Sequence, residues 1–322
     1  MNIGLDVGYS ALKAVSGDRR VTFPSVVGTP DKARFSLDGS KAIVLTRPVS
    51  AMVGEEAIAQ SRFLNRREDR GWVEGDEWYA LALASLTELT SATVADLVIV
   101  TGLPVTFYAD KAIVRDRLLG EHKVQREGRR AQSLRVSDCR VIPQPFGALL
   151  SATLDDRGRI VDQVLATSAV GVIDVGGKTT NLLSVNRLSE ISRETASVNV
   201  GAWDVVRAVK TWLADHCPDL DLRDHQVVDA IIARQVSYYG ERIDIAPVVE
   251  GGIAPLADQV IAEATQLWNG GAALGAILVS GGGALLLGGH IRQHFRHARA
   301  VDDPVFANAL GFWRFAQYLG RQ

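Results

Sequence analysis

Two short stretches of the sequence each place a carboxylate and a glycine at the point where an apolar run breaks. The tripeptide Asp-Val-Gly occurs at residues 6–8, after the apolar start of the chain, and again at residues 174–176. Glycine lets the backbone turn tightly and come close to a ligand, and consecutive N–H groups in such a turn form a concave anion site. Both stretches are therefore predicted to fold as a strand, a phosphate-sized turn and a second strand.

The two carboxylates, Asp6 and Asp174, cannot bind phosphate themselves because like charges repel. They suit a hydrated divalent cation, since Mg²⁺ keeps most of its waters and prefers one or two carboxylates plus phosphate oxygens. The hydroxyl residues Ser10, Thr179 and Thr180 can add hydrogen-bond donors. We therefore expect the two hairpins to hold one Mg-nucleotide polyphosphate from both sides, with both aspartates reaching the metal through water.

The structural interpretation of these turns is the alternative. A single Asp-x-Gly in a hairpin is usually only a turn, because Asp and Gly are ordinary turn residues. Here the motif occurs twice, each time after an apolar strand and before a strand that carries hydroxyl groups. The repetition favours ligand binding, and the rest of the chain is expected to be arranged around the two hairpins.

Composition excludes several classes of protein. A chain of 322 residues is long enough for two domains, and its 47% hydrophobic and 22% charged residues are typical of a soluble globular protein. A net charge of −2 and a pI near 6.3 argue against direct binding of nucleic acid by the whole surface. Any contact with DNA is expected to need a partner or a local patch.

The expected location is the cytoplasm. The chain opens directly into a predicted strand, without the basic leader and apolar run of a signal peptide. No stretch approaches the roughly 20 apolar residues of a membrane span. The two cysteines, Cys139 and Cys217, do not form a CxxC motif, which suggests a reducing compartment.

Apolar periodicity predicts the elements that position the two turns. In the first half it predicts a helix over Trp78–Leu89, a buried strand over Ala95–Val105 and a helix that begins near Phe146. In the second half it predicts helices over Gly201–Leu213, Asp224–Arg234 and Ile253–Gln266, a buried strand from Ala276 into three glycines, and C-terminal helices over His290–Arg299 and Ala307–Leu319. Hairpin sheets and crossing helices thus occur twice in the same order, which predicts two open α/β sheets.

Two further groups of residues have competing interpretations. Gln144 follows Pro143 at a predicted helix start, where a polar side chain is commonly structural. His290, His294 and His297 have helical spacing and suggest a metal site. Arginines alternate with these histidines, and their charge opposes cation binding, so a solvated basic face is favoured there.

With both hairpins, the proline-bounded helix and the Ser-Gly-Gly-Gly turn in place, the chain resembles the actin, Hsp70 and sugar-kinase superfamily of ATPases. Within it, the sequence is most similar to the ParM-type actin-like proteins that segregate plasmids. Three segments favour that type: Phe23–Val27, Val53–Ala57 and Thr101–Val105. The resemblance spans nearly the whole chain.

The resemblance implies an α/β fold with two duplicated actin-like domains, of ribonuclease H-like topology, and a nucleotide cleft between them. The first domain is expected over residues 1–157, with a small insertion at about 28–90, completed by a C-terminal helix at about 303–322. The second domain is expected over residues 158–302.

The resemblance also implies roles for individual residues. Asp6 would hold water on the metal, Lys13 would reach the β and γ phosphates, and Gln144 would orient the attacking water, with Asp174 polarising that water or the metal shell. The remaining residues implied to bind the nucleotide belong to two phosphate loops, a loop near the ribose and an adenosine motif: Gly8, Tyr9 and Ser10; Gly176, Gly177, Lys178, Thr179 and Thr180; Gly201 and Asp204; Gly281, Gly282 and Gly283.

Two positions depart from the family pattern. Asn181 stands where many relatives carry an Asp after the Thr-Thr pair, and Lys178 places a cation in a turn that is often neutral. The expected cofactors are Mg²⁺ and ATP, with GTP as the alternative nucleotide.

The leading hypothesis is an ATPase that polymerises into nucleotide-dependent cytoskeletal filaments for plasmid segregation. Its expected partners are further copies of itself, added head to tail, and a small DNA-binding adaptor protein. One alternative is a non-polymerising small-molecule kinase or chaperone-like ATPase of the same superfamily. Another is a scaffold that binds nucleotide without hydrolysing it.

Overall fold

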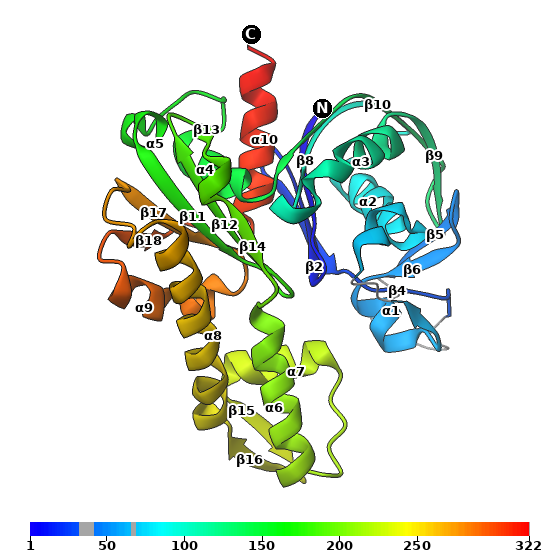
Figure 1. The fold of residues 1–322 in the computed structure, drawn as a ribbon. Coiled ribbons are helices and arrows are strands. Elements are labelled where there is room, and N and C mark those ends of the chain that lie inside the picture. Colours follow the sequence, from blue (N-terminus) through cyan, green and yellow to red (C-terminus); the bar gives the residue numbers. More distant parts are fainter. Residues whose placement is uncertain (32–41, 66–68, 322) are drawn as a thin grey trace. The chain divides into compact units, whose positions relative to one another are not determined.

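The computed structural model describes residues 1–31, 42–65 and 69–321. The chain forms two compact units, of which unit 1 comprises residues 1–168 and 301–322, and unit 2 comprises residues 169–300 (Figure 1). The insertion expected at about 28–90 belongs to unit 1, and its residues 32–41 and 66–68 lie outside the described part.

In its described residues, unit 1 is built on a ten-stranded mixed sheet with the order β3-β2-β1-β8-β10-β9-β5-β6-β4-β7. The first hairpin, β1 and β2, is antiparallel, whereas β1 runs parallel to β8 and β8 parallel to β10. The strands are β1 (Asn2–Val7), β2 (Ala11–Ser16), β3 (Arg19–Pro24), β4 (Val27–Gly28), β5 (Ile43–Arg47), β6 (Ala51–Val53), β7 (Leu64–Asn65), β8 (Val94–Leu103), β9 (Gly120–Arg126) and β10 (Gln132–Pro143).

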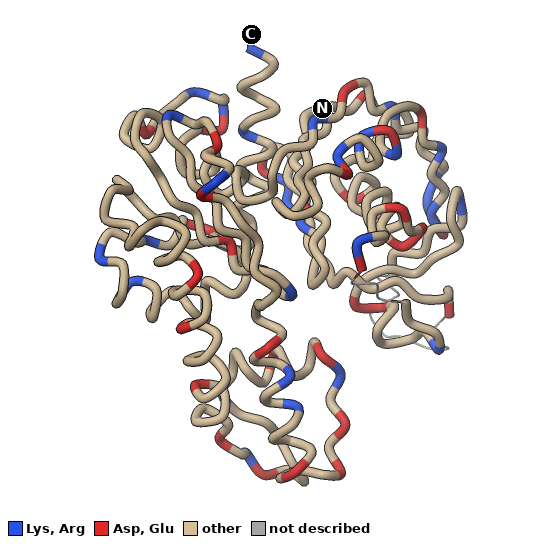
Figure 2. Tube along the Cα trace, in the orientation of Figure 1, with Lys and Arg blue, Asp and Glu red and all other residues tan. Residues whose placement is uncertain are grey.

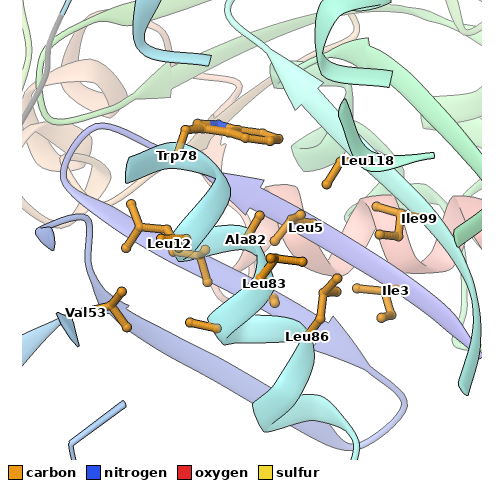
Figure 3. Close-up of a cluster of buried hydrophobic side chains, with 14 of the residues drawn as sticks. Ile3, Leu5, Leu12, Val53, Trp78, Ala82, Leu83, Leu86, Ile99 and Leu118 are labelled. Carbon is orange, nitrogen blue, oxygen red and sulfur yellow. The ribbon is translucent and has the colours of Figure 1, made fainter. Parts of the chain in front are cut away.

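Helix α2 covers one face of the central strands. Its residues Asp76–Leu89 are apolar almost all round, as expected for a helix that is buried. Figure 3 shows Leu83 and Leu86 of α2 next to Ile3 and Leu5 of β1, and all four side chains are fully buried. These contacts form the main hydrophobic core of unit 1.

Helix α10 (Ala307–Leu319) covers the opposite face of the same strands. Successive residues of a strand point to opposite faces, and Val100 of β8, whose neighbour Ile99 belongs to the α2 side, packs against Phe312 of α10. Gly4 of β1 also meets α10, since a Cβ atom there would lie 1.9 Å from the Ala309 carbonyl oxygen. The two helices thus enclose the strands that carry the first turn.

The other helical segments of unit 1 are shorter. They are α1 (Glu55–Gln60), η1 (Arg70–Glu74), η2 (Val105–Asp110), α3 (Lys111–Leu118), α4 (Pro145–Thr153) and α5 (Gln163–Thr167). Helix α4 begins one residue before the position predicted from its prolines. Its backbone is in direct contact with the backbone of α10, since a Cβ atom on Gly311 would lie 1.8 Å from the Gly147 carbonyl oxygen.

Unit 2 contains a second sheet, with the order β13-β12-β11-β17-β18 and β14 paired to β12, and a separate hairpin. Its strands are β11 (Ala169–Val175), β12 (Thr180–Asn186), β13 (Ser189–Glu190), β14 (Ala196–Val198), β15 (Gln235–Tyr238), β16 (Glu241–Asp244), β17 (Ala276–Ser280) and β18 (Ala298–Ala300). Its helical segments are η3 (Ser192–Glu194), α6 (Ala202–His216), α7 (Asp224–Ala233), α8 (Ala246–Leu267) and α9 (Ala284–His294). As in unit 1, an antiparallel hairpin is followed by a parallel strand, here β11–β12 and then β17.

Two predicted helix boundaries in unit 2 are wrong. Helix α8 begins at Ala246 rather than at Ile253 and continues through two glycines and Pro255. The predicted helix over His290–Arg299 is instead the end of α9, which stops at His294, followed by β18. The three histidines therefore do not share one helix face, because His297 lies beyond the helix end. Within the described ranges, no helix is long and apolar enough to cross a membrane.

The contact between α4 and α10 gives a first prediction. Gly311→Ala places a methyl group against the Gly147 backbone, which cannot move without displacing α4. We expect a loss of about 3 kcal/mol in the free energy of unfolding, at the upper end for overpacking, measured by urea denaturation. Gly289→Ala in α9 is the control, since no heavy atom lies within 4 Å of its added Cβ. That variant is expected to gain up to about 1 kcal/mol from helix propensity, and equal losses in both variants would contradict the packing argument.

Candidate nucleotide-binding turns

In unit 1, Asp6 lies at the carboxyl end of β1 with 4% of its surface exposed. The Gln144 side chain donates a hydrogen bond from Nε2 to Asp6 Oδ1 over 2.8 Å. Gln144 directly follows β10 and caps α4, and its backbone N–H donates to the Leu103 carbonyl oxygen at the end of β8. The parallel order β1-β8-β10 thus brings two residues that are 138 positions apart to one edge of the sheet.

The turn between β1 and β2 is held by Ser25. The Ser25 hydroxyl donates to the Gly8 carbonyl oxygen (2.5 Å), and the Ser25 N–H donates to the Ser10 carbonyl oxygen (3.0 Å). Tyr9 between them donates from its hydroxyl to the Asp69 carbonyl oxygen at 3.4 Å. The backbone conformation of this turn is therefore fixed by contacts from outside the hairpin.

Lys13 lies opposite Asp6 in the antiparallel register of β1 and β2. Its Nζ donates to the Ala11 carbonyl oxygen (3.1 Å) and lies 3.9 Å from the position that a Cβ atom on Gly8 would take. The ammonium group is thus beside the turn, where it can meet an anion that the turn binds.

In unit 2, Asp174 lies near the end of β11 with 2% of its surface exposed. The Ser280 hydroxyl donates to Asp174 Oδ1 over 2.9 Å, and the two residues are paired in the parallel register of β11 and β17. Across the hairpin, Asp174 pairs with Asn181, whose Oδ1 accepts a hydrogen bond from the Ser197 hydroxyl of β14. Asn181, which departs from the family pattern, therefore binds the neighbouring strand.

The turn after β11 is fixed by the start of α6. The Ala202 and Trp203 N–H groups donate to the carbonyl oxygens of Gly176 (3.0 Å) and Gly177 (2.9 Å). Gly201 is required at this contact, because a Cβ atom there would lie 2.4 Å from the Gly177 oxygen. The turn and the helix terminus therefore form one rigid piece.

Other predicted residues of this turn have different surroundings. The Asp204 side chain accepts a hydrogen bond from the Gly201 N–H (2.8 Å). Thr180 is fully buried and its hydroxyl donates to the Val200 carbonyl oxygen (2.9 Å), whereas Thr179 is 8% exposed and Lys178 is half-buried. The Thr180 hydroxyl thus binds the protein backbone in this structure.

The three glycines after β17 pack against the end of β11. Gly281 has φ +83°, and a Cβ atom there would lie 2.3 Å from the Val175 carbonyl oxygen. Gly283, which precedes α9, donates its N–H to the same oxygen over 2.9 Å. A Cβ atom on Gly282 would meet nothing within 4 Å, so only the middle glycine borders open space.

The structure therefore gathers the predicted residues into two groups, one in each unit. The first group contains Asp6, Gly8, Tyr9, Ser10, Lys13 and Gln144. The second contains Asp174, Gly176, Gly177, Lys178, Thr179, Thr180, Gly201, Asp204, Gly281, Gly282 and Gly283.

The sequence did not identify Ser25 and Ser280 as members of these groups. Ser280 could have been identified from the sequence, because a hydroxyl at the end of an apolar strand needs a hydrogen-bond partner. It also directly precedes the three glycines at 281–283. Ser25 carried no such signal, because a Pro-Ser pair at a strand end is common in turns.

The donor groups fit Mg²⁺ bound mainly by phosphate and water. Over residues 1–31, 42–65 and 69–321, no group of three or more His, Cys, Asp or Glu side chains could hold a metal ion by itself. Each unit instead offers one buried carboxylate beside a glycine turn, and Mg²⁺ is often bound by one or two carboxylates plus substrate phosphates.

Family models of actin-like proteins match most of each unit. The model of the actin-like protein N-terminal domain matches residues 4–147, and the model of the archaeal MreB-like actin homologue C-terminal domain matches residues 172–293. No curated protein matches the sequence significantly.

Solved structures of actin homologues have the same fold over the whole chain. The archaeal actin homologue Ta0583 is 23% identical, with a TM-score of 0.83, and the match covers 100% of this chain and 99% of that one. Its complex with ADP gives a TM-score of 0.81 at 23% identity, covering 100% of this chain and 99% of that one. The subunit of a 15-stranded ParM filament from Clostridium botulinum is 22% identical, with a TM-score of 0.82 and 98% of both chains covered. The predicted fold class and family resemblance are confirmed.

The bond between Ser280 and Asp174 gives a second prediction. Ser280→Ala leaves the buried carboxylate without this donor, which should cost about 1 to 3 kcal/mol in the free energy of unfolding, measured by urea denaturation. The exposed Ser237 in β15 is the matched control, and Ser237→Ala should change stability by less than about 0.5 kcal/mol. Equal unfolding midpoints for the two variants would mean that the Ser280 hydroxyl does not stabilise Asp174.

Proposed function

The chain belongs to the actin-like superfamily, and on that premise we propose that it is an ATPase that binds Mg-ATP and assembles into nucleotide-dependent filaments. One observation supports this most directly. Each unit carries a buried aspartate at the end of a central strand, beside a glycine turn. Hydrogen bonds from residues outside the hairpin fix the conformation of that turn. Two such turns are what a polyphosphate held by two domains requires.

We expect the residues of the two groups to bind different parts of the nucleotide. We expect the Gly8–Ser10 turn and Lys13 to bind the β and γ phosphates, and the turn at residues 176–179 to bind them from unit 2. Gly281, Gly282 and Gly283 would lie against the adenosine, and Gly201 and Asp204 near the ribose. Bound Mg²⁺ would offset the phosphate charge, with Asp6 and Asp174 accepting hydrogen bonds from its waters.

We expect Gln144 to orient the attacking water. Its amide Nε2 donates to Asp6, which fixes the plane of the amide and leaves Oε1 to accept a hydrogen bond from a water molecule. An amide is not a strong base, so its contribution is orientation, which is the main requirement of phosphoryl transfer. Asp174 would polarise the same water or the metal shell.

Filament formation is proposed from the fold and the likeness to ParM. The C. botulinum protein was solved as a filament, and this chain matches 98% of it. Copies would add head to tail through a heterologous contact that does not close into a ring. For plasmid segregation in the cytoplasm, DNA would be bound by a separate small adaptor protein, since the net charge of −2 gives this chain little general attraction for DNA.

The role of Gln144 can be tested by mutation. Gln144→Ala should slow phosphate release at least about tenfold, because the water loses its orientation, while the affinity for ATP changes less than about threefold. Phosphate release is measured with a coupled assay and affinity with a fluorescent ATP analogue. Asp174→Ala is the comparison and should abolish release. Loss of ATP binding in Gln144→Ala would mean that this residue only supports the structure of unit 1.

Filament formation is tested by ultracentrifugation. With ATP the protein should pellet above a critical concentration, and with ADP most of it should stay in the supernatant, since hydrolysis is expected to weaken the polymer. A protein that hydrolyses ATP but stays monomeric at high concentration would contradict the filament. Stimulation of hydrolysis by a small metabolite would then favour the alternative kinase.

A further inference from the structure

Unit 1 contains a cavity of about 480 Å³ between α3 and β10. Its walls include Tyr108 and two residues of α3, Lys111 and Arg115, on one side, and Asp138, Cys139 and Arg140 of β10 on the other. None of these residues belongs to the two groups around Asp6 and Asp174. The cavity is therefore a separate feature of the molecule.

The lining of this cavity is strongly basic. Three cationic side chains surround it, against one carboxylate. Asp138 accepts from Arg140 Nε over 3.1 Å, and this contact does not involve the two terminal guanidinium nitrogens. Among the residues that the structure describes, neither Lys111 nor Arg115 forms an ion pair. Two positive charges thus remain in excess around the cavity.

Two of the basic residues repel each other along one helix. Lys111 and Arg115 are spaced i, i+4 on α3, where like charges destabilise a helix by a few tenths of a kcal/mol. Figure 2 shows Lys and Arg interspersed with Asp and Glu along the chain in both units. A bound anion would offset the repulsion.

Tyr108 in the wall of the cavity contacts residues on both sides of it. Lys111 Nζ lies 4.7 Å from the centroid of the Tyr108 ring, within cation–π distance. The Tyr108 hydroxyl donates to the Val141 carbonyl oxygen over 3.3 Å, which ties the ring to β10. Tyr108 therefore contacts both the Lys111 ammonium group and β10.

The thiol in the wall takes no part in covalent chemistry. Burial is the main cause and the charge of Asp138 the second cause that raise the pKa of Cys139 to about 12, while the charge of Arg115 opposes the shift. The thiol is therefore protonated at neutral pH and is a poor nucleophile. The site is suited to recognition by charge.

We propose that this cavity binds a small phosphorylated molecule that carries at least two negative charges. Two excess positive charges match a phosphate monoester or a diphosphate, and the planar guanidinium groups of Arg115 and Arg140 suit bidentate contact with phosphate oxygens. The volume lies within the range of small-molecule sites. The proposal does not depend on the ATPase function.

The test uses inorganic pyrophosphate and isothermal titration calorimetry of the full chain. Arg115→Ala and Arg140→Ala should each weaken binding at least about tenfold, because each removes a charge-assisted hydrogen bond. Arg135→Ala is the control, since Arg135 is exposed on β10 and does not line the cavity, and it should change the affinity less than about twofold. Lys111→Gln is a milder variant in case an Arg variant does not fold, and it should also weaken binding.

Hydrogen exchange locates the binding. Pyrophosphate should slow exchange in peptides that contain residues 108–115 and 138–141. An affinity that is the same in all four variants, or protection confined to the turns at residues 8–10 and 176–179, would overturn the proposal. These outcomes leave the ATPase proposal unaffected, because they concern different residues.

Discussion

The structure depends on two carboxylates that are buried at the ends of strands. Removing a carboxylate from water costs several kcal/mol unless hydrogen bonds or charges offset it, and Asp6 and Asp174 are almost fully buried. Each accepts from a side chain of a different element, Gln144 before α4 and Ser280 at the end of β17. The requirement to stabilise each carboxylate therefore fixes the neighbouring element, and with it the turn that follows the aspartate.

Close backbone contacts transmit that constraint to the helices. Helix α4, which begins after Gln144, packs on α10 through Gly147 and Gly311. The first N–H groups of helix α6 donate to carbonyl oxygens of the turn after Asp174. Only glycine fits at position 201, because a Cβ atom there would collide with the turn. In both units the helix next to the site contacts its neighbour through backbone atoms. Such contacts allow little adjustment, because backbone atoms cannot change rotamer as side chains can.

Sequence patterns correctly predicted those elements that are determined by interactions between residues close together in the chain. The repeated Asp-Val-Gly tripeptide correctly predicted two hairpins, and the predicted helix over Ala307–Leu319 is α10. The predicted helix began only at Ile253, after Gly251 and Gly252, which are poor helix formers. The helix continues there since Gly252 packs on Val205 of α6, so that tertiary contact outweighs propensity. Likewise α9 ends before His297 because β18 pairs with β17, a long-range contact that periodicity does not contain.

The adjacent Thr179 and Thr180 show why a motif does not assign roles by itself. In the sequence the two hydroxyls look equivalent as donors to a phosphate. Thr180 begins β12 and its side chain points toward the backbone at Val200, where its hydroxyl is engaged. Thr179 precedes the strand, in the turn itself, and is 8% exposed. The Thr180 hydroxyl therefore fixes the start of the strand that follows the turn, and two adjacent threonines that look equivalent in the sequence have different surroundings in the structure.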